Sequence, residues 1–109
     1  MFRIAMCLAI VGLAGTVPVA AQDATQGEKV FTAQKCGLCH SIAGKGNPKG
    51  PLEEGVAKLS AADIRAWITD AKGMTAKTNA TRKPAMKEFT LPKEDVDALV
   101  AYLSSIKAK

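Results

Sequence analysis

The run Cys36-Gly37-Leu38-Cys39-His40 constrains this chain more than any other part of its sequence. Two thiols three positions apart, with an imidazole directly after the second, are typical of a c-type haem attachment site. The spacing matters because the two sulfurs form thioether bonds with the two vinyl groups on one edge of a porphyrin. The histidine is then held beneath the ring, within reach of the iron. The run therefore predicts Cys36 and Cys39 as haem links and His40 as an iron ligand.

Other uses of a Cys-x-x-Cys pair suit the chain less well. A zinc site takes four nitrogen or sulfur ligands, and the chain has only one further cysteine, Cys7, and a single histidine. A thioredoxin-like redox pair lies beside a βαβ pattern, and no alternation typical of strands is present. A disulfide between Cys36 and Cys39 would close a very small loop. Haem attachment accounts for both thiols and the imidazole.

Residues 1–21 have the pattern of a secretory signal peptide. A basic start at Arg3 precedes a short apolar run, and small residues lead to a cleavage position after Ala21. The apolar run is shorter than the roughly 20 residues of a membrane-spanning helix, although an uncleaved anchor is the alternative. Cleavage predicts a mature domain over residues 22–109 in the periplasm, where the setting is oxidising. It also removes Cys7, so that no thiol is left over.

Capping signals and apolar periodicity predict a first helix over residues 23–35. Thr25-x-x-Glu28 matches a capping box, and the helix leads directly to Cys36. A glycine inside a helix costs about 1 kcal/mol relative to alanine. We therefore expect Gly27 to allow another helix to come close.

A second helix is predicted from Ser60 to Gly73. Ser60 and Asp63 resemble a capping box, and Leu59 and Ile64 are spaced as a hydrophobic staple. Gly73 is the expected C-cap.

A third helix is predicted to follow Pro92, because apolar residues recur at helical spacing as far as Ile106. Residues 41–58 and 74–89 are predicted to be loops. The chain is thus expected to be all-α, a single small domain of helices and long loops around the haem. Because so small a domain buries little surface, we expect the chain without haem to be poorly folded.

Haem iron takes two axial ligands, and the chain has no second histidine. Thioether sulfur suits an iron that passes electrons. Met86 is the first candidate because Pro84 fixes the backbone just before it. Met74 is the second candidate, and a lysine or an open site are further alternatives. Either methionine could instead simply fill the core.

Two more residues are predicted to lie around the haem. A metal-ligating histidine usually donates its other ring N–H to a carbonyl or carboxylate, and the carbonyl of Pro51 is the candidate acceptor. Trp67 is expected to pack in the interior. Its indole N–H needs a partner when buried, and a haem propionate is one possibility.

The ordered set of these segments resembles the small class I cytochromes c of bacteria. The matching residues are Gly27 and Phe31, Cys36 to His40, Gly50-Pro51-Leu52, Trp67-Ile68, Pro84-Ala85-Met86, and Leu99 with Tyr102-Leu103. The resemblance implies a monohaem cytochrome c fold in which the first and last helices cross, with Gly27 and Phe31 against Leu99 and Tyr102.

The resemblance also implies roles for single residues. These are Cys36 and Cys39 as thioether links, His40 and Met86 as axial ligands, and Pro51 as the carbonyl partner of the histidine. Two positions depart from the family pattern. Lys87 stands where a proline often follows the ligand methionine, and Pro92 replaces the usual serine cap of the last helix.

The function expected from these features is that of a periplasmic one-electron carrier with no substrate turnover of its own. The chain has a formal net charge of +5, which favours redox partners with an acidic docking face. Neither nucleic acid nor stable membrane insertion is expected. The basic residues near the haem are Lys35, Lys45, Lys49, Arg82, Lys83 and Lys87. The alternatives are a cytochrome subunit of a periplasmic dehydrogenase or oxidase complex, and a haem enzyme or gas sensor with an open sixth site.

Overall fold

The computed structural model of the protein describes residues 19–107. Most of the predicted signal peptide, including Cys7, lies outside these residues, so cleavage after Ala21 stays a prediction. Within residues 19–107, none of the helices is both long and apolar enough to cross a membrane.

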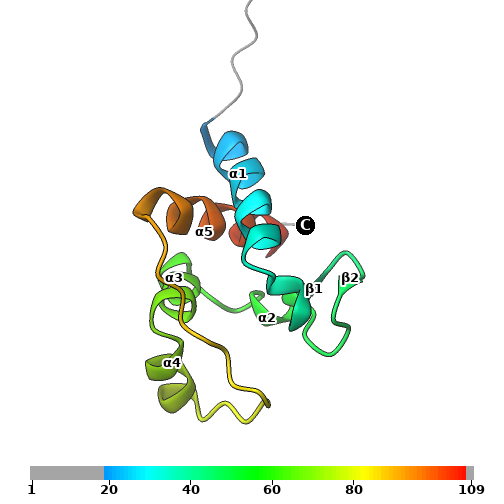
Figure 1. Ribbon diagram of the computed structural model, residues 1–109, viewed down its shortest axis with the longest axis vertical. Helices are drawn as coiled ribbons and strands as arrows, with labels where there is room; N and C mark the ends of the chain where they lie inside the picture. The colour runs from blue at the N-terminus through cyan, green and yellow to red at the C-terminus, as the bar shows by residue number, and fades with distance from the viewer. Residues whose placement is uncertain (1–18, 108–109) are drawn as a thin grey trace, which may run out of the picture.

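The described chain is mostly helical, which confirms the predicted fold class (Figure 1). Its elements are α1 (Val19–Ala33), the 3-10 turn η1 (Cys36–Leu38), β1 (Ser41–Ile42), β2 (Lys45–Gly46), α2 (Leu52–Gly55), α3 (Ala61–Thr69), α4 (Ala71–Thr78) and α5 (Lys93–Lys107). The two short strands form an antiparallel hairpin with Ser41 opposite Gly46 and Ile42 opposite Lys45.

Helices α1 and α5 cross closely, as predicted (Figure 1). A Cβ atom on Gly27 would collide with the carbonyl oxygen of Ala98 and with Cβ of Tyr102. Phe31 packs edge-on against Tyr102, with ring centroids 5.9 Å apart and an interplanar angle of 75°. Gly27 therefore allows α5 to pack closely on α1, as predicted, because any side chain at this position would push α5 away.

The core forms where α1, α3 and α5 meet. Its buried apolar residues are Val30, Val56, Ile64, Ile68, Val96, Leu99, Val100, Leu103 and Ile106. Arg65 on α3 pairs with Asp97 on α5 at 2.5 Å, and Lys93 reaches the other oxygen of Asp97 at 2.7 Å. The hydrogen bonds from Lys93 and Arg65 lower the pKa of Asp97. All three side chains are partly or fully exposed, so the pairs add little to stability, and only the Arg65–Asp97 pair joins α3 to α5.

The first helix differs from its predicted bounds. It begins at Val19 and ends at Ala33, so Thr25 and Glu28 lie inside the helix, and their predicted capping box is wrong for this chain. Lys35 follows in the left-handed conformation at φ 58°, which turns the chain out of the helix axis and into η1.

The predicted second helix is two helices, α3 and α4, that meet at Asp70. The capping box of Ser60 and Asp63 at the start of α3 is confirmed. Gly73 is not a C-cap, because it lies in the first turn of α4. Its N–H donates to the Asp70 side chain at 3.2 Å, and a Cβ there would collide with that carboxylate. The glycine that predicts the end of one helix therefore lies at the start of the next.

The predicted loops are also shorter than expected. Helix α2 lies within residues 41–58, and α4 covers Met74 to Thr78. The chain from residue 79 to residue 92 is irregular and returns from the end of α4 alongside α3 to α5 (Figure 1). The N–H of Phe89 donates to the carbonyl of Ile68 at 3.0 Å, which fixes this return path to α3.

Candidate functional site

The two cysteines lie at the ends of one tight turn. Both Cys39 and His40 donate their backbone N–H to the carbonyl of Cys36, at 3.2 and 3.0 Å. Cys36 is half-buried and Cys39 is exposed. Burial raises the pKa of the Cys36 thiol, and the positive charge of Lys87 acts in the opposite direction. Both thiols are free, so the disulfide alternative is not formed.

The hairpin and the loop after it hold this turn in place. The N–H of Asn47 donates to the carbonyls of Gly37 and His40, each at 3.0 Å. The Asn47 side-chain amide donates to the carbonyl of Leu38 at 3.1 Å. Gly46, at φ +108°, passes so close to the turn that a Cβ would meet the backbone of Gly37 and His40. The turn carrying the thiols is therefore fixed by backbone contacts that need a glycine at position 46.

His40 presents one ring nitrogen to the protein and leaves the other available. Its Nδ1 lies 3.3 Å from the carbonyl oxygen of Gly50, and in the described part of the chain Nε2 has no hydrogen-bond partner. Burial lowers the pKa of His40, and the positive charge of Arg82 lowers it further, against the opposing effect of the Gly50 carbonyl. The neutral imidazole is the form that ligates a metal.

The carbonyl that faces His40 in the structure is that of Gly50, one residue before the predicted Pro51. Pro51 is the N-cap of α2, and its carbonyl instead accepts the N–H of Gly55 at 3.1 Å. The neighbouring carbonyl of Gly50 faces the imidazole and also accepts the N–H of Ser41 at 2.9 Å. The sequence did not reveal that α2 starts directly after Pro51, and that helix start takes the Pro51 carbonyl away from the histidine.

The two candidate methionines lie in different surroundings. Met74 is buried in α4, with 8% of its surface exposed, where a methionine serves as core filler. Met86 is half-buried in the irregular segment after α4. Trp67 is also half-buried, on α3. Met86, Trp67 and Pro51 remain predictions as haem contacts.

The segment around Met86 reaches the cysteine turn. The guanidinium of Arg82 donates to the carbonyl of Cys39, and the charge of Lys87 acts on the Cys36 thiol. Met86 lies between these two residues in sequence, so the structure brings its segment to the Cys36–His40 turn. The sequence predicts Arg82 and Lys87 as basic residues near the haem. It contains no local signal for the contact between Arg82 and Cys39.

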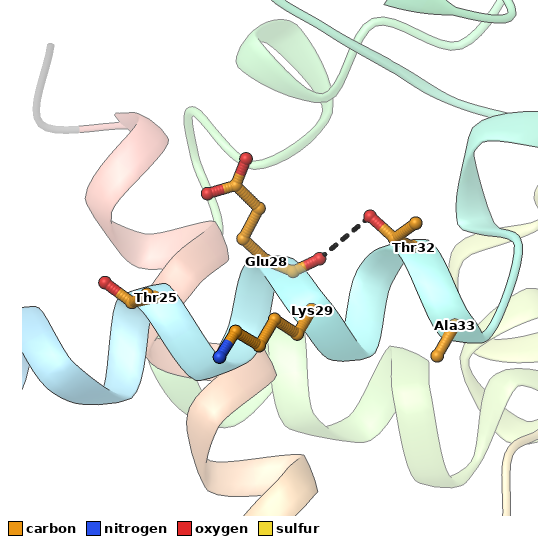
Figure 2. Close-up of a pocket in the computed structure, with 5 residues that line it drawn as sticks. All are labelled: Thr25, Glu28, Lys29, Thr32 and Ala33. Atoms are coloured by element: carbon orange, nitrogen blue, oxygen red, sulfur yellow. Dashed lines mark hydrogen bonds between the residues drawn. The ribbon is translucent and has the colours of Figure 1, made fainter.

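A shallow pocket on the exposed face of α1 is a different feature (Figure 2). It is lined by Thr25, Glu28, Lys29, Thr32 and Ala33. The Thr32 hydroxyl donates to the carbonyl of Glu28 at 3.1 Å, a bond within the helix. The lining contains no thiol, imidazole or thioether, so the chemistry of Cys36, Cys39 and His40 lies elsewhere.

The donor set of the turn fits a covalently held haem. Two free thiols flank one turn, an imidazole follows with Nε2 available, and its other nitrogen faces a carbonyl. Within residues 19–107, no three or more His, Cys, Asp or Glu side chains gather to hold a bare metal ion. A porphyrin brings four nitrogen ligands of its own, so the iron in it needs from the chain only axial donors.

Comparison with known proteins agrees with this chemistry. The family model described as "Cytochrome c" matches residues 24–107. The cytochrome c oxidase subunit 2 of Alkalihalophilus pseudofirmus is 31% identical over 93 residues, which is 77% of this chain and 26% of that protein. The chain thus spans about a quarter of the length of that relative. No solved structure matches the chain significantly.

Proposed function

The chain belongs to the cytochrome c family, and on this basis we propose that it is an exported one-electron carrier. In this proposal Cys36 and Cys39 hold one haem c, and His40 and Met86 are the axial ligands. The observation that carries the proposal is the His40 ring, with Nδ1 turned to the Gly50 carbonyl and Nε2 available beside two free thiols. Family membership supports haem c, electron transport and redox partner proteins.

The haem supplies an iron that alternates between Fe(III) and Fe(II). The residues of the chain orient the axial ligands and set the reduction potential. The Gly50 carbonyl orients His40, which keeps the imidazole in one orientation and raises its basicity as a ligand. A thioether from Met86 would raise the reduction potential. With both axial positions filled by the chain, no substrate has access to the iron, and turnover of a substrate is not part of the proposal.

A second candidate function has one specific observation in its favour. The match to a cytochrome c oxidase subunit 2 supports a role for the chain as the cytochrome part of an oxidase complex. Co-purification of the chain with oxidase subunits at fixed stoichiometry would favour this candidate over a free carrier.

An absorption spectrum of the purified, reduced protein tests the proposal. We expect the narrow bands of a six-coordinate c-type haem that stays with the chain after acid–acetone extraction. Carbon monoxide should leave the spectrum unchanged, because the sixth position is filled. Haem that is extracted by acid–acetone contradicts the thioether links, and rapid carbon monoxide binding by the native protein contradicts the Met86 ligand.

The proposed docking surface surrounds Cys39. Leu38, beside it, is 72% exposed and is the one large hydrophobic residue so exposed among the residues with described side chains. The basic residues proposed to surround it are all exposed: Lys35, Lys45, Lys49, Arg82, Lys83 and Lys87. An apolar centre with a charged rim is the arrangement of a small, transient interface.

We expect electron transfer to an acidic partner protein to slow as salt is added. The screening length falls from about 30 Å at 0.01 M to about 8 Å at 0.15 M ionic strength, and the rate should fall by roughly tenfold. Stopped-flow mixing measures it. An uncharged small-molecule reductant is the control and should show no comparable change. A rate with the protein partner that is flat or rises with salt contradicts docking through the basic surface.

A further inference from the structure

The segment that carries Met86 is held firmly at its C-terminal end. The N–H of Phe89 donates to the carbonyl of Ile68 on α3 at 3.0 Å. The carboxylate of Glu88 accepts the N–H of Lys72, in the first turn of α4, at 3.2 Å. The end of the segment is therefore attached to the α3–α4 unit.

At the N-terminal end, one side chain attaches the segment to the cysteine turn. Arg82 donates from Nη2 to the carbonyl oxygen of Cys39, 43 residues earlier in the chain. Its guanidinium also lies against Gly50, where an added Cβ would collide with Arg82 and with the Cys39 carbonyl. The absence of a side chain at position 50 thus leaves the space that Arg82 fills.

The two residues that Arg82 touches are the immediate surroundings of His40. Cys39 precedes the histidine, and Gly50 provides the carbonyl 3.3 Å from its Nδ1. One side chain thus connects the segment carrying Met86 to the surroundings of His40.

We propose that Arg82 is a positioning residue that keeps the sulfur of Met86 on the iron by fastening its segment to the carbonyl of Cys39. This inference rests on the proposed function, in which Met86 is the sixth ligand. Without the Arg82 contact, the chain from the end of α4 at Thr78 to Glu88 loses its attachment to the cysteine turn. A longer free segment has more conformations to lose when its methionine binds, so the sulfur should dissociate more often.

An external ligand measures how often the sixth position is open. Such a ligand binds only the open form, so its apparent affinity rises in proportion to the population of that form. Imidazole is a suitable probe because its neutral form is insensitive to the charge removed by a substitution. Titration of the ferric protein with imidazole, followed by the loss of the far-red sulfur-to-iron absorption band, gives the apparent affinity.

R82A and K83A are a matched pair of variants. Both residues are exposed, adjacent and cationic, but within the described chain Lys83 makes no hydrogen bond or ion pair. We expect R82A to bind imidazole roughly fivefold more tightly than the unmodified protein, the effect of losing one hydrogen bond. K83A should bind imidazole like the unmodified protein. R82K, which keeps the charge and one donor, should fall between R82A and the unmodified protein.

Equal imidazole affinities for R82A and K83A would overturn the inference, because loss of the Cys39 contact would then have no effect of its own. If R82A yields too little haem protein to titrate, R82K is compared with K83A instead. Equal imidazole affinities for these two variants would likewise overturn the inference. The failure of the proposed function looks different. An unmodified ferric protein without the sulfur-to-iron band would show that Met86 is not the ligand, whatever the variants do.

Discussion

Replacing Met86 by alanine is expected to open the iron and lower its reduction potential. His/Met ligation raises the potential of a c-type haem, and axial ligands as a group span a range of about 0.8 V. Loss of the thioether should therefore lower the midpoint by on the order of 0.1 V or more. The reduced variant should bind carbon monoxide, and the ferric variant should lack the far-red sulfur-to-iron band. Redox titration and absorption spectroscopy measure these changes.

Met74→Ala is the matched control, because the structure gives the two methionines different surroundings. Met74 is buried in α4, so its truncation should destabilise the protein by about 2–3 kcal/mol. The spectrum and the potential should stay as in the unmodified protein. The opposite pattern, with ligation lost in M74A and kept in M86A, would assign the sixth position to Met74 and refute the proposed ligand pair. A band already absent from the unmodified ferric protein would favour a lysine as the sixth ligand.

Local signals in the sequence predicted the parts of this fold that depend on local chemistry. The Ser60 capping box is formed because its donors and acceptors lie within one turn. Gly27 indicated a close helix contact because a glycine inside a helix has a cost that only packing explains, and α5 lies against it. The Cys36–His40 run indicated haem because its spacing follows the covalent chemistry of the porphyrin edge.

A local pattern predicts the wrong structure where it has two possible meanings or where distant segments of the chain meet. Gly73 is typical of a helix end, but here Asp70 caps a second helix and Gly73 lies in its first turn. The choice between the carbonyls of Gly50 and Pro51 depends on where α2 begins, and four residues are too short for a periodic pattern to show. The contact between Arg82 and Cys39 spans 43 residues, so no local pattern could predict it.

Preventing haem attachment is expected to have the largest effect of all on the fold. The turn from Cys36 to His40 lies outside the apolar core and is held by hydrogen bonds from Asn47 and Arg82. Trp67 and Met86 are only half-buried, and Leu38 is exposed. The side of the molecule that carries this turn therefore leaves apolar surface of Leu38 and Met86 uncovered by the described chain. Because a group bound only by the native state stabilises that state, its loss should unfold this side first.

The double variant C36A/C39A tests this expectation. Small domains are stable by only about 5–15 kcal/mol, and we expect the colourless variant to lose its cooperative thermal transition and its near-ultraviolet circular dichroism. The pair of α1 and α5, joined through Gly27 and the Phe31–Tyr102 contact, should keep the most helical signal. The single variant C36A, which keeps one thioether, should retain colour and melt at an intermediate temperature. A colourless double variant that melts cooperatively near the temperature of the unmodified protein would show that the polypeptide core alone determines the fold.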